Sequence, residues 1–263
     1  MKIATYNVNS VNARTENLGK WLNKENPDVV LLQEIKSEFN SFPFFDVQTW
    51  GYEAKIFGQK SYNGVAILSR NKINIIEENL PELKDENSRY LEAEVEVDGI
   101  TYRISSVYLP NGNPPYNNPD DDAKWKYKLQ WMEAFYEHTA KLKELQKPVI
   151  IGGDFNVIMT DNDVYNPDEF RNNALFRPEV RQRLRAFELM GFFDSFRALY
   201  PKDNGYTYWD YSGAALQNDQ GMRIDYLWMN SLAFDKLVDV RVNKEPRFDN
   251  KPSDHTVLQA ELR

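Results

Sequence analysis

The chain of 263 residues contains no cysteine and only two histidines. The absence of cysteine excludes disulfides, thiolate nucleophiles and zinc sites with cysteine ligands. No apolar run approaches the roughly 20 residues that cross a membrane. The N-terminus also lacks the apolar segment and small-residue cleavage site of a secretory signal. These absences predict an intracellular protein without a membrane span.

Basic residues are in the minority, because 32 Lys and Arg stand against 40 Asp and Glu, for a formal net charge of −8. This balance argues against binding of nucleic acid by bulk electrostatics. It still allows an enzyme that has a local basic patch and holds divalent cations among its carboxylates. Hydrophobic residues make up 41% of the chain, which is ample material for a core.

Apolar runs and turn signals predict an alternation of strands and helices, with no linker, repeat or low-complexity segment between them. Strands are expected over residues 2–7, 27–34, 52–57, 64–69, 73–78, 90–97, 100–109, 206–209, 224–229, 237–243 and 256–262, and a buried strand follows Pro148. Asp98-Gly99 is a hairpin turn signal between two of these strands. Helices are expected over about 13–24 with Asn12 as cap, over about 120–146, and over about 178–190.

The longest predicted helix opens at the acidic triplet 120–122, which suits the positive end of a helix dipole. Its inward stripe at helical spacing is expected to be core: Trp125, Leu129, Met132, Tyr136 and Thr139. Strand-rich halves separated by helices predict an α/β fold with two mixed sheets packed face to face and helices outside. Because both halves contribute polar strand ends, we expect one domain over residues 1–263.

The most informative stretch is 149–156, where an apolar run ends in Asp154 and Asn156. Side chains along a strand repeat every second residue, so these two are expected on the same side of the strand end. A carboxylate and an amide so placed can share one bound oxygen, from a water or a phosphate. A polar turn that caps the next segment is the alternative, because Asp and Asn are common turn residues.

Other predicted strands also begin or end in side chains suited to metal or phosphate chemistry. Glu34 directly follows an apolar run, and an unpaired carboxylate buried there would cost several kcal/mol, so a cation or strong donors must lie nearby. The remaining polar strand ends are Asn7 and Asn9, Tyr108, Asp225, and Ser253-Asp254-His255.

The two histidines differ in context. His138 lies in the long helix and is expected at its surface, without a catalytic role. His255 follows an aspartate at a strand entrance and is the better candidate for function. Carboxylates from Glu34, Asp154 and Asp225 add hard oxygen ligands suited to Mg²⁺ or Mn²⁺. This combination indicates metal-assisted hydrolysis of a phosphodiester.

The same residues carry a family resemblance. Asn7 and the motifs at 32–34, 153–156, 223–225 and 253–255 occur in the order found in the exonuclease III family. This family comprises apurinic/apyrimidinic (AP) endonucleases within the endonuclease/exonuclease/phosphatase superfamily, and the resemblance runs from residue 2 to about 262. It implies a DNase I-like, four-layer α/β sandwich with the site at one edge of the two sheets. It also implies Mg²⁺-dependent hydrolysis 5′ to abasic sites in duplex DNA, with 3′-phosphodiesterase and 3′→5′ exonuclease activity.

The resemblance assigns roles to the matching positions. Metal ligands are expected among Asn7, Glu34, Asp154, Asn156, Asp254 and His255, with Glu34 as the principal one and Mn²⁺ able to replace Mg²⁺. Asp154 would orient or deprotonate the attacking water, and Asn156 would help to position it or the phosphate. Asp225 would fix the tautomer of His255 and favour its charged form. His255 and Tyr108 would face the phosphate oxygens, where negative charge grows in the transition state.

Substrate contacts are expected from loops. An abasic sugar flipped out of the duplex would enter an apolar pocket made by Tyr208, Trp209, Met222 and Ile224; for Trp209, sheet core is the alternative. Phosphate contacts are expected from Asn111, Asn113, Arg171, Asn172 and Asn173. The one dense basic stretch is Arg177, Arg181, Arg183 and Arg185. It is either part of a DNA footprint or a solvated helix face.

Two other functions compete with this interpretation. One is a superfamily phosphodiesterase acting on inositol phosphates, sphingomyelin or non-specific DNA, but these relatives usually carry a second histidine where this chain has Tyr108-Leu109-Pro110. The other is a catalytically inactive binding module, which would be expected to lack an acidic residue or the histidine. The family resemblance implies a bacterial, cytoplasmic enzyme whose partner is duplex DNA with abasic sites or blocked 3′ ends, and we expect it to be a monomer.

Overall fold

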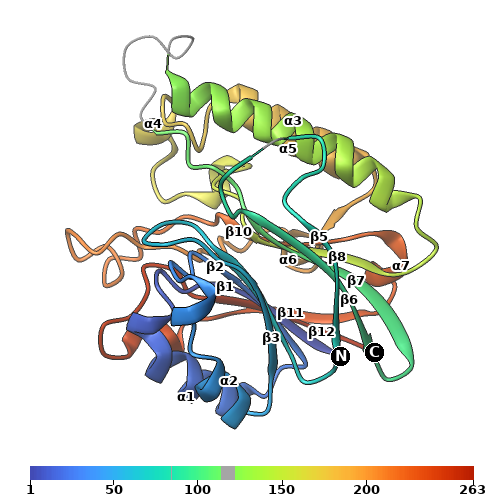
Figure 1. Ribbon diagram of the computed structural model, residues 1–263. Helices are drawn as coiled ribbons and strands as arrows, with labels where there is room; N and C mark the ends of the chain where they lie inside the picture. Colours follow the sequence, from blue (N-terminus) through green and yellow to red (C-terminus); the bar gives the residue numbers. More distant parts are fainter. Residues whose placement is uncertain (84, 114–121) are drawn as a thin grey trace.

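The computed structural model describes residues 1–83, 85–113 and 122–263. Two six-stranded sheets lie face to face, with helices on both outer sides (Figure 1). The strands of the first sheet are β1 (Lys2–Asn7), β2 (Val29–Gln33), β3 (Glu53–Phe57), β4 (Val65–Ser69), β11 (Leu237–Asn243) and β12 (Val257–Leu262). They are ordered β11-β12-β1-β2-β4-β3.

The second sheet is ordered β5-β6-β7-β8-β10-β9. Its strands are β5 (Ile73–Glu78), β6 (Tyr90–Val97), β7 (Ile100–Tyr108), β8 (Val149–Asp154), β9 (Phe193–Asp194) and β10 (Asp225–Met229). Both sheets mix parallel and antiparallel pairs, since β1 is parallel to β2 but antiparallel to β12, and β8 is parallel to β7 but antiparallel to β10.

The α-helices of the described residues are α1 (Thr15–Glu25), α2 (Phe44–Thr49), α3 (Ala123–Lys143), α4 (Pro167–Phe170), α5 (Pro178–Leu189), α6 (Ser195–Leu199) and α7 (Ser231–Phe234). In Figure 1, α1 and α2 cover the outer side of the first sheet, while α3 and α5 lie together over the second. None of the described helices is both long and apolar enough to span a bilayer.

Three apolar layers hold these elements together. Leu31, Ile104 and Leu227 belong to the cluster between the two sheets. A second cluster joins α3 and α5 to the outer face of their sheet, and a third joins α1 and α2 to the other sheet. The expected α/β class, with two mixed sheets between helices, is confirmed.

Strand direction brings the polar strand ends to one edge of the sandwich. Parallel β1 and β2 end together, with Asn7 opposite Gln33, and parallel β7 and β8 end with Tyr108 opposite Asp154. Antiparallel β10 begins where β8 ends, so Asp225 is also paired with Asp154. The carboxyl ends of four strands and the start of a fifth therefore meet at one place.

Most element predictions are confirmed, and the bounds of β5, β6 and β11 match the expected ranges. The hairpin at Asp98-Gly99 is also present, with both residues at positive φ. The first helix begins later than expected, at Thr15, after a 3₁₀ turn, and Asn12 provides no side-chain cap. Asp122 caps α3 by accepting from two backbone N–H groups, while 120 and 121 lie outside the described residues.

Three expectations are wrong. Residues 206–209 form no strand but make isolated bridges through Tyr208 to Met222 and His255. Tyr136 is exposed rather than part of the inward stripe of α3. His138 is buried rather than on the surface, because its ring pairs with the buried carboxylate of Glu92 at 2.7 Å.

Candidate active site

A cavity of about 560 Å³ opens at the edge where the polar strand ends meet. Its lining includes carboxylate, amide and imidazole groups, among them Glu34, Asp154, Asn156 and His255. It also includes a more apolar set, most of which belongs to one hydrophobic cluster and which is called here the apolar wall: Tyr165, Phe170, Leu175, Tyr208, Met222 and Ile224. One cavity therefore combines a polar centre with a surface that can receive an apolar group.

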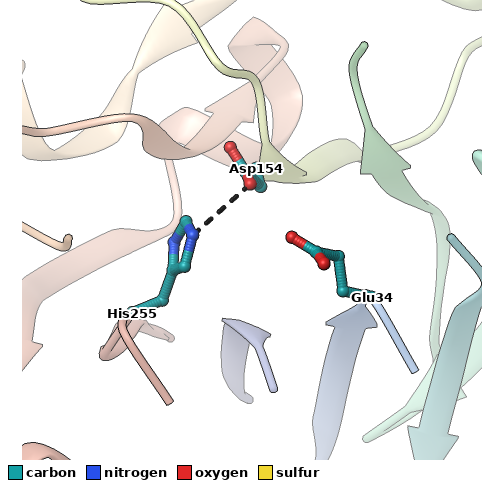
Figure 2. Close-up of side chains that lie close together, drawn as sticks. All are labelled: Glu34, Asp154 and His255. Atoms are coloured by element: carbon teal, nitrogen blue, oxygen red, sulfur yellow. Dashed lines mark ion pairs between the residues drawn. The ribbon is translucent and has the colours of Figure 1, made fainter. Parts of the chain in front are cut away.

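Three side chains at this centre could hold a metal ion. Figure 2 shows Glu34 after β2, Asp154 at the end of β8 and His255 just before β12, all pointing toward one another. One ligand atom from each lies within 4.8 Å of the other two. The two carboxylates supply the oxygen donors that a hard divalent cation prefers, and the imidazole could join them as a ligand only in its neutral form.

The amide of Asn7 ties the two carboxylates together. Its Nδ2 donates to Glu34 Oε1 and to Asp154 Oδ2, at 2.9 Å in each case. Its Oδ1 accepts from the backbone N–H of Asn9 at 3.0 Å. In this arrangement, Asn7 orients both carboxylates through its two N–H groups.

The other two expected ligands also have partners. Asn156 donates to the carbonyl of Leu109 and accepts from Asn111, so its amide is held in the cavity wall. Asp254 lines the cavity and accepts from Nδ2 of Asn9 at 3.0 Å, but it lies outside the three-residue group.

His255 lies between two carboxylates. Its Nδ1 is 2.9 Å from Asp225 Oδ2, and its Nε2 is 3.6 Å from Asp154 Oδ2. Burial alone would lower the pKa of His255, but the negative charges of Asp225 and Asp154 raise it to about 10. The imidazole is therefore a cation at neutral pH and can face a phosphate oxygen.

Burial raises the pKa of Asp154 to about 7, and the charges of Asp225 and Glu34 act in the same direction while His255 opposes them. The pKa of Glu34 moves the other way. Burial would raise it, but hydrogen bonds from Asn7 and the ammonium of Lys36 lower it. Lys36 Nζ lies 2.9 Å from Glu34 Oε2, a contact that sequence reasoning missed although Lys36 follows Glu34 by two residues.

Tyr108 presents a hydroxyl group to the centre from the end of β7. Burial and the carboxylates of Glu34 and Asp154 raise its pKa well above the ordinary value. The phenol therefore keeps its proton and acts as a donor. Arg89, which the sequence did not single out, lies over the Tyr108 ring at 4.7 Å and donates to the Tyr108 carbonyl.

The expected sugar pocket is only partly assembled as predicted. Tyr208, Met222 and Ile224 line the cavity, and the Tyr208 ring meets the His255 ring edge-on at 5.0 Å. Trp209 is fully buried in a small separate cluster with Tyr206 and Ala215, and its Nε1 donates to Asp219. The expectation that Trp209 contacts DNA is therefore corrected, because its neighbour takes the cavity side.

The expected phosphate contacts also divide into two sets. Asn111, Asn113 and Asn173 line the cavity. Arg171 and Asn172 are exposed and do not line it, and the Arg171 guanidinium pairs with two aspartates at 3.1 and 3.3 Å. Three arginines of the neighbouring basic stretch are likewise paired with carboxylates: Arg177 with Glu179, Arg181 with Asp161, and Arg183 with Glu133. The fourth, Arg185, forms no ion pair with a described residue.

Comparison with known proteins identifies the family. The model of the Endonuclease/Exonuclease/phosphatase family matches residues 4–255. Exodeoxyribonuclease III of Haemophilus influenzae is 30% identical over 271 residues, covering 100% of both chains.

Two solved structures have the same architecture. An AP endonuclease from Archaeoglobus fulgidus superimposes with a TM-score of 0.91 at 32% identity, covering 100% of this chain and 99% of the other. The 3′ phosphatase NExo from Neisseria, bound to a product DNA hairpin, superimposes with a TM-score of 0.93 at 34% identity and the same coverage. The chain belongs to the endonuclease/exonuclease/phosphatase family, as an enzyme of the exodeoxyribonuclease III and AP endonuclease type.

Proposed function

We propose that the chain is a Mg²⁺-dependent DNA-repair phosphodiesterase that cleaves duplex DNA on the 5′ side of abasic sites. We also propose that it removes blocking groups or nucleotides from 3′ ends, and that Mn²⁺ can replace Mg²⁺. The carrying observation is that ligand atoms of Glu34, Asp154 and His255 lie within 4.8 Å of one another, in the same cavity as the apolar wall. The relatives named above include an exodeoxyribonuclease, an AP endonuclease and a 3′ phosphatase.

The donor set fits a hard divalent cation. Glu34 is the principal holder, because its lowered pKa keeps it anionic and Asn7 fixes its orientation. Asp254 is a further acidic contact at the cavity wall. When bound, the cation supplies positive charge to the phosphate and to the leaving 3′-oxygen.

Hydrolysis then follows from the residues of this chain. Asp154 accepts a proton from water, for which a pKa of about 7 is well matched. The water oxygen attacks phosphorus and the bond to the 3′-oxygen breaks. The leaving 3′-oxygen takes a proton from solvent, which gives a 3′-hydroxyl and a 5′-phosphate, and Asp154 then releases its proton to solvent. The His255 imidazolium and the Tyr108 hydroxyl stabilise the charge that grows on the phosphate oxygens. Asp225 keeps the imidazole oriented through the 2.9 Å contact to Nδ1.

Specificity for abasic sites follows from the apolar wall. A deoxyribose without its base can leave the duplex and rest against Tyr208, Met222 and Ile224, whereas an intact nucleotide would have to break its stacking and pairing first. In this proposal the enzyme acts as a monomer in the cytoplasm, which light scattering and cell fractionation would test.

The test is incision of a duplex with one tetrahydrofuran site, beside an intact duplex, a 3′-phosphate hairpin and an inositol phosphate. We expect rapid incision 5′ to the tetrahydrofuran with Mg²⁺ or Mn²⁺, and none after chelation. Asp154→Asn, which keeps the shape of the side chain, is the control and should lose incision. Hydrolysis of the inositol phosphate without DNA incision would replace this proposal, and unchanged incision by Asp154→Asn would remove Asp154 from the mechanism.

A further inference from the structure

Lys128 lies on α3, but its side chain is fully buried beneath the amide side of the cavity. Its Nζ donates to three backbone carbonyls: Asn111 at 3.0 Å, Asn156 at 2.7 Å and Ala174 at 3.1 Å. Three acceptors around one nitrogen need all three hydrogens of an ammonium group. Among the ion pairs of the described residues, none involves Lys128. Burial lowers the pKa of Lys128 to about 7, the charge of Asp154 opposes that shift, and three carbonyl acceptors at hydrogen-bond distance favour the protonated form.

The three carbonyls belong to three separate loops, which follow β7, β8 and α4. Each of these loops also places an asparagine on the cavity wall: Asn111, Asn156 and Asn173. On the cavity side, Asn111 Nδ2 donates to Asn156 Oδ1 at 3.1 Å, and the N–H of Ala174 donates to Asn113 Oδ1 at 3.2 Å. The amide wall is therefore linked at its surface by side chains and from beneath by one ammonium group.

Gly112 provides an independent sign of how closely the first loop approaches Lys128. Its φ is +78°, and a Cβ at this position would lie 2.6 Å from Lys128 Cδ and 3.2 Å from its Cβ. Glycine is thus needed here both for the backbone conformation and for contact with the lysine stem.

Either kind of side chain has a cost at this position. Removing an ammonium from water costs several kcal/mol, but an apolar side chain of similar length would leave three buried carbonyls without a donor, at about 1–3 kcal/mol each. The ammonium does what an apolar side chain cannot, because it fixes three carbonyl oxygens at hydrogen-bond distance from one point. That constraint determines where the neighbouring asparagine amides lie.

We propose that Lys128 is a positioning residue for DNA cleavage, whose ammonium holds the three loops so that their asparagine amides meet the phosphate backbone in the correct geometry. The phosphate-facing role of these amides rests on the proposed function. A misplacement of about 1 Å costs on the order of 100-fold in rate, so the effect appears in turnover even if the protein stays folded.

The experiment compares Lys128→Met, which keeps length and removes charge, with Lys126→Met, an exposed lysine of the same helix. Turnover is measured well below the melting temperature of each variant, on whichever DNA substrate the parent cleaves fastest. A failure on abasic DNA would then reject the proposed substrate without affecting this test. We expect Lys128→Met to lose about 100-fold in kcat and to bind Mn²⁺ like the parent, and Lys126→Met to retain parental kcat.

A double-mutant cycle with Asn111→Ala separates positioning from a general loss of stability. If Lys128 acts through the wall, Asn111→Ala will cost much less in the Lys128→Met background than in the parent. A folded Lys128→Met variant with parental kcat would overturn the proposal. So would a double mutant whose loss in kcat equals the product of the losses in the two single mutants. If Lys128→Met does not fold, Lys128→Gln decides, because it keeps N–H donors for the carbonyls but its shorter, uncharged side chain cannot hold all three of them at one nitrogen. Reduced kcat in that variant supports the proposal and parental kcat rejects it.

Discussion

Glu34 and Asp154 are acidic side chains of the same cavity, but their surroundings shift their pKa values in opposite directions. Hydrogen bonds from Asn7 and the charge of Lys36 outweigh burial and lower the pKa of Glu34. Burial, with Asp225 and Glu34, raises the pKa of Asp154 to about 7. Pairs of groups pushed apart in this way commonly divide the work of catalysis. Glu34 is thus suited to hold a cation, and Asp154 to accept a proton.

His255→Ala tests the role of the buried imidazolium. Its charge matters most when negative charge grows on the phosphate, so we expect kcat to fall by at least about 100-fold. The dissociation constant for abasic duplex should change by less than about threefold. Steady-state kinetics and fluorescence anisotropy would measure the two effects, and equal losses in affinity and turnover would contradict the assignment.

Substitution of Asp163 tests how much the buried ion pairs next to the active site contribute to stability. Its buried Oδ1 accepts from Arg223 at 2.7 Å and from Arg197 at 2.6 Å, and Arg223 is two residues from Asp225. Asp163→Asn leaves two arginines short of a partner, so we expect it to lower the free energy of unfolding by about 3–5 kcal/mol at pH 7. Asp161→Asn, whose carboxylate is half exposed, is the matched control and should change stability by less than about 1 kcal/mol.

The pH dependence of Asp163→Asn has a defined sign. Burial acts to raise the pKa of Asp163, but Arg223 and Arg197 outweigh it and lower the pKa. A lowered pKa contributes stability above the unfolded value of about 3.9, and this contribution is lost as the pH falls through the folded value. Urea unfolding should therefore show the parent and variant converging below about pH 4. If the two proteins differed in free energy of unfolding by the same amount down to pH 2.5, the difference would not come from the charge of Asp163.

Among the elements, β8 places the tightest constraint on the site. Gly153 lies between Val107 and Tyr226 in the sheet, directly before Asp154. A Cβ at Gly153 would come within 1.9 Å of the carbonyl oxygen of Val107, a backbone atom that cannot move without breaking the pairing of β7 and β8. Glycine at position 153 is therefore required by the pairing of the sheet.

Gly153→Ala should lower the free energy of unfolding by about 3 kcal/mol or more, and should lower kcat because Asp154 moves with the strand. Gly51→Ala is the control, since its φ is +86° but a Cβ there meets nothing within 4 Å. It should cost only about 1–2 kcal/mol from backbone strain. Thermal melts and incision assays would distinguish the two, and similar effects of both changes would argue against the steric account.

Sequence pattern predicted the elements whose burial is periodic and the residues that end them. Glu34, Asp154, Asp225 and His255 were found because each adjoins an apolar run, and strand direction alone then brings them together. The strand prediction for residues 206–209 was wrong because aromatic residues are typical of strands, whereas the backbone of this segment makes only isolated bridges.

Contacts formed between distant segments could not be predicted in this way. Lys128 reaches carbonyls 17, 28 and 46 residues away. Helical spacing places Lys128 on the buried face, three residues after Trp125 and four before Met132, but it does not show which carbonyls the ammonium reaches. His138 was misplaced for a related reason, because its partner Glu92 lies on a strand 46 residues earlier in the chain.

At the scale of the whole molecule, the two ends of the chain are joined. β1 pairs with β12, with Lys2 opposite Glu261, and the cluster between the sheets contains residues from both halves. We propose that residues 1–263 fold as one domain, so urea unfolding followed by far-UV circular dichroism and by tryptophan fluorescence should give coincident transitions. Two separated transitions would contradict this.

The charge distribution predicts how DNA binding responds to salt. The chain carries a formal net charge of −8, and none of the described residues that line the cavity is a lysine or arginine. Arg171 and Arg181 are both paired with Asp161, whereas Arg89 lies over the Tyr108 ring. We therefore expect DNA binding to release few counterions, and affinity to depend on the cation and on the amide wall.

Six to ten phosphate contacts would give a slope of log affinity against log salt of about −5 to −9. We expect a shallower slope for this protein. Fluorescence anisotropy at several salt concentrations, with catalytically inactive Asp154→Asn, would measure it. Arg171→Gln and Arg181→Gln should each change the slope by less than about 0.5, because each arginine already has an acidic partner. A change of about one for either substitution would show that the arginine leaves its aspartate for a DNA phosphate, and the basic stretch would then belong to the footprint.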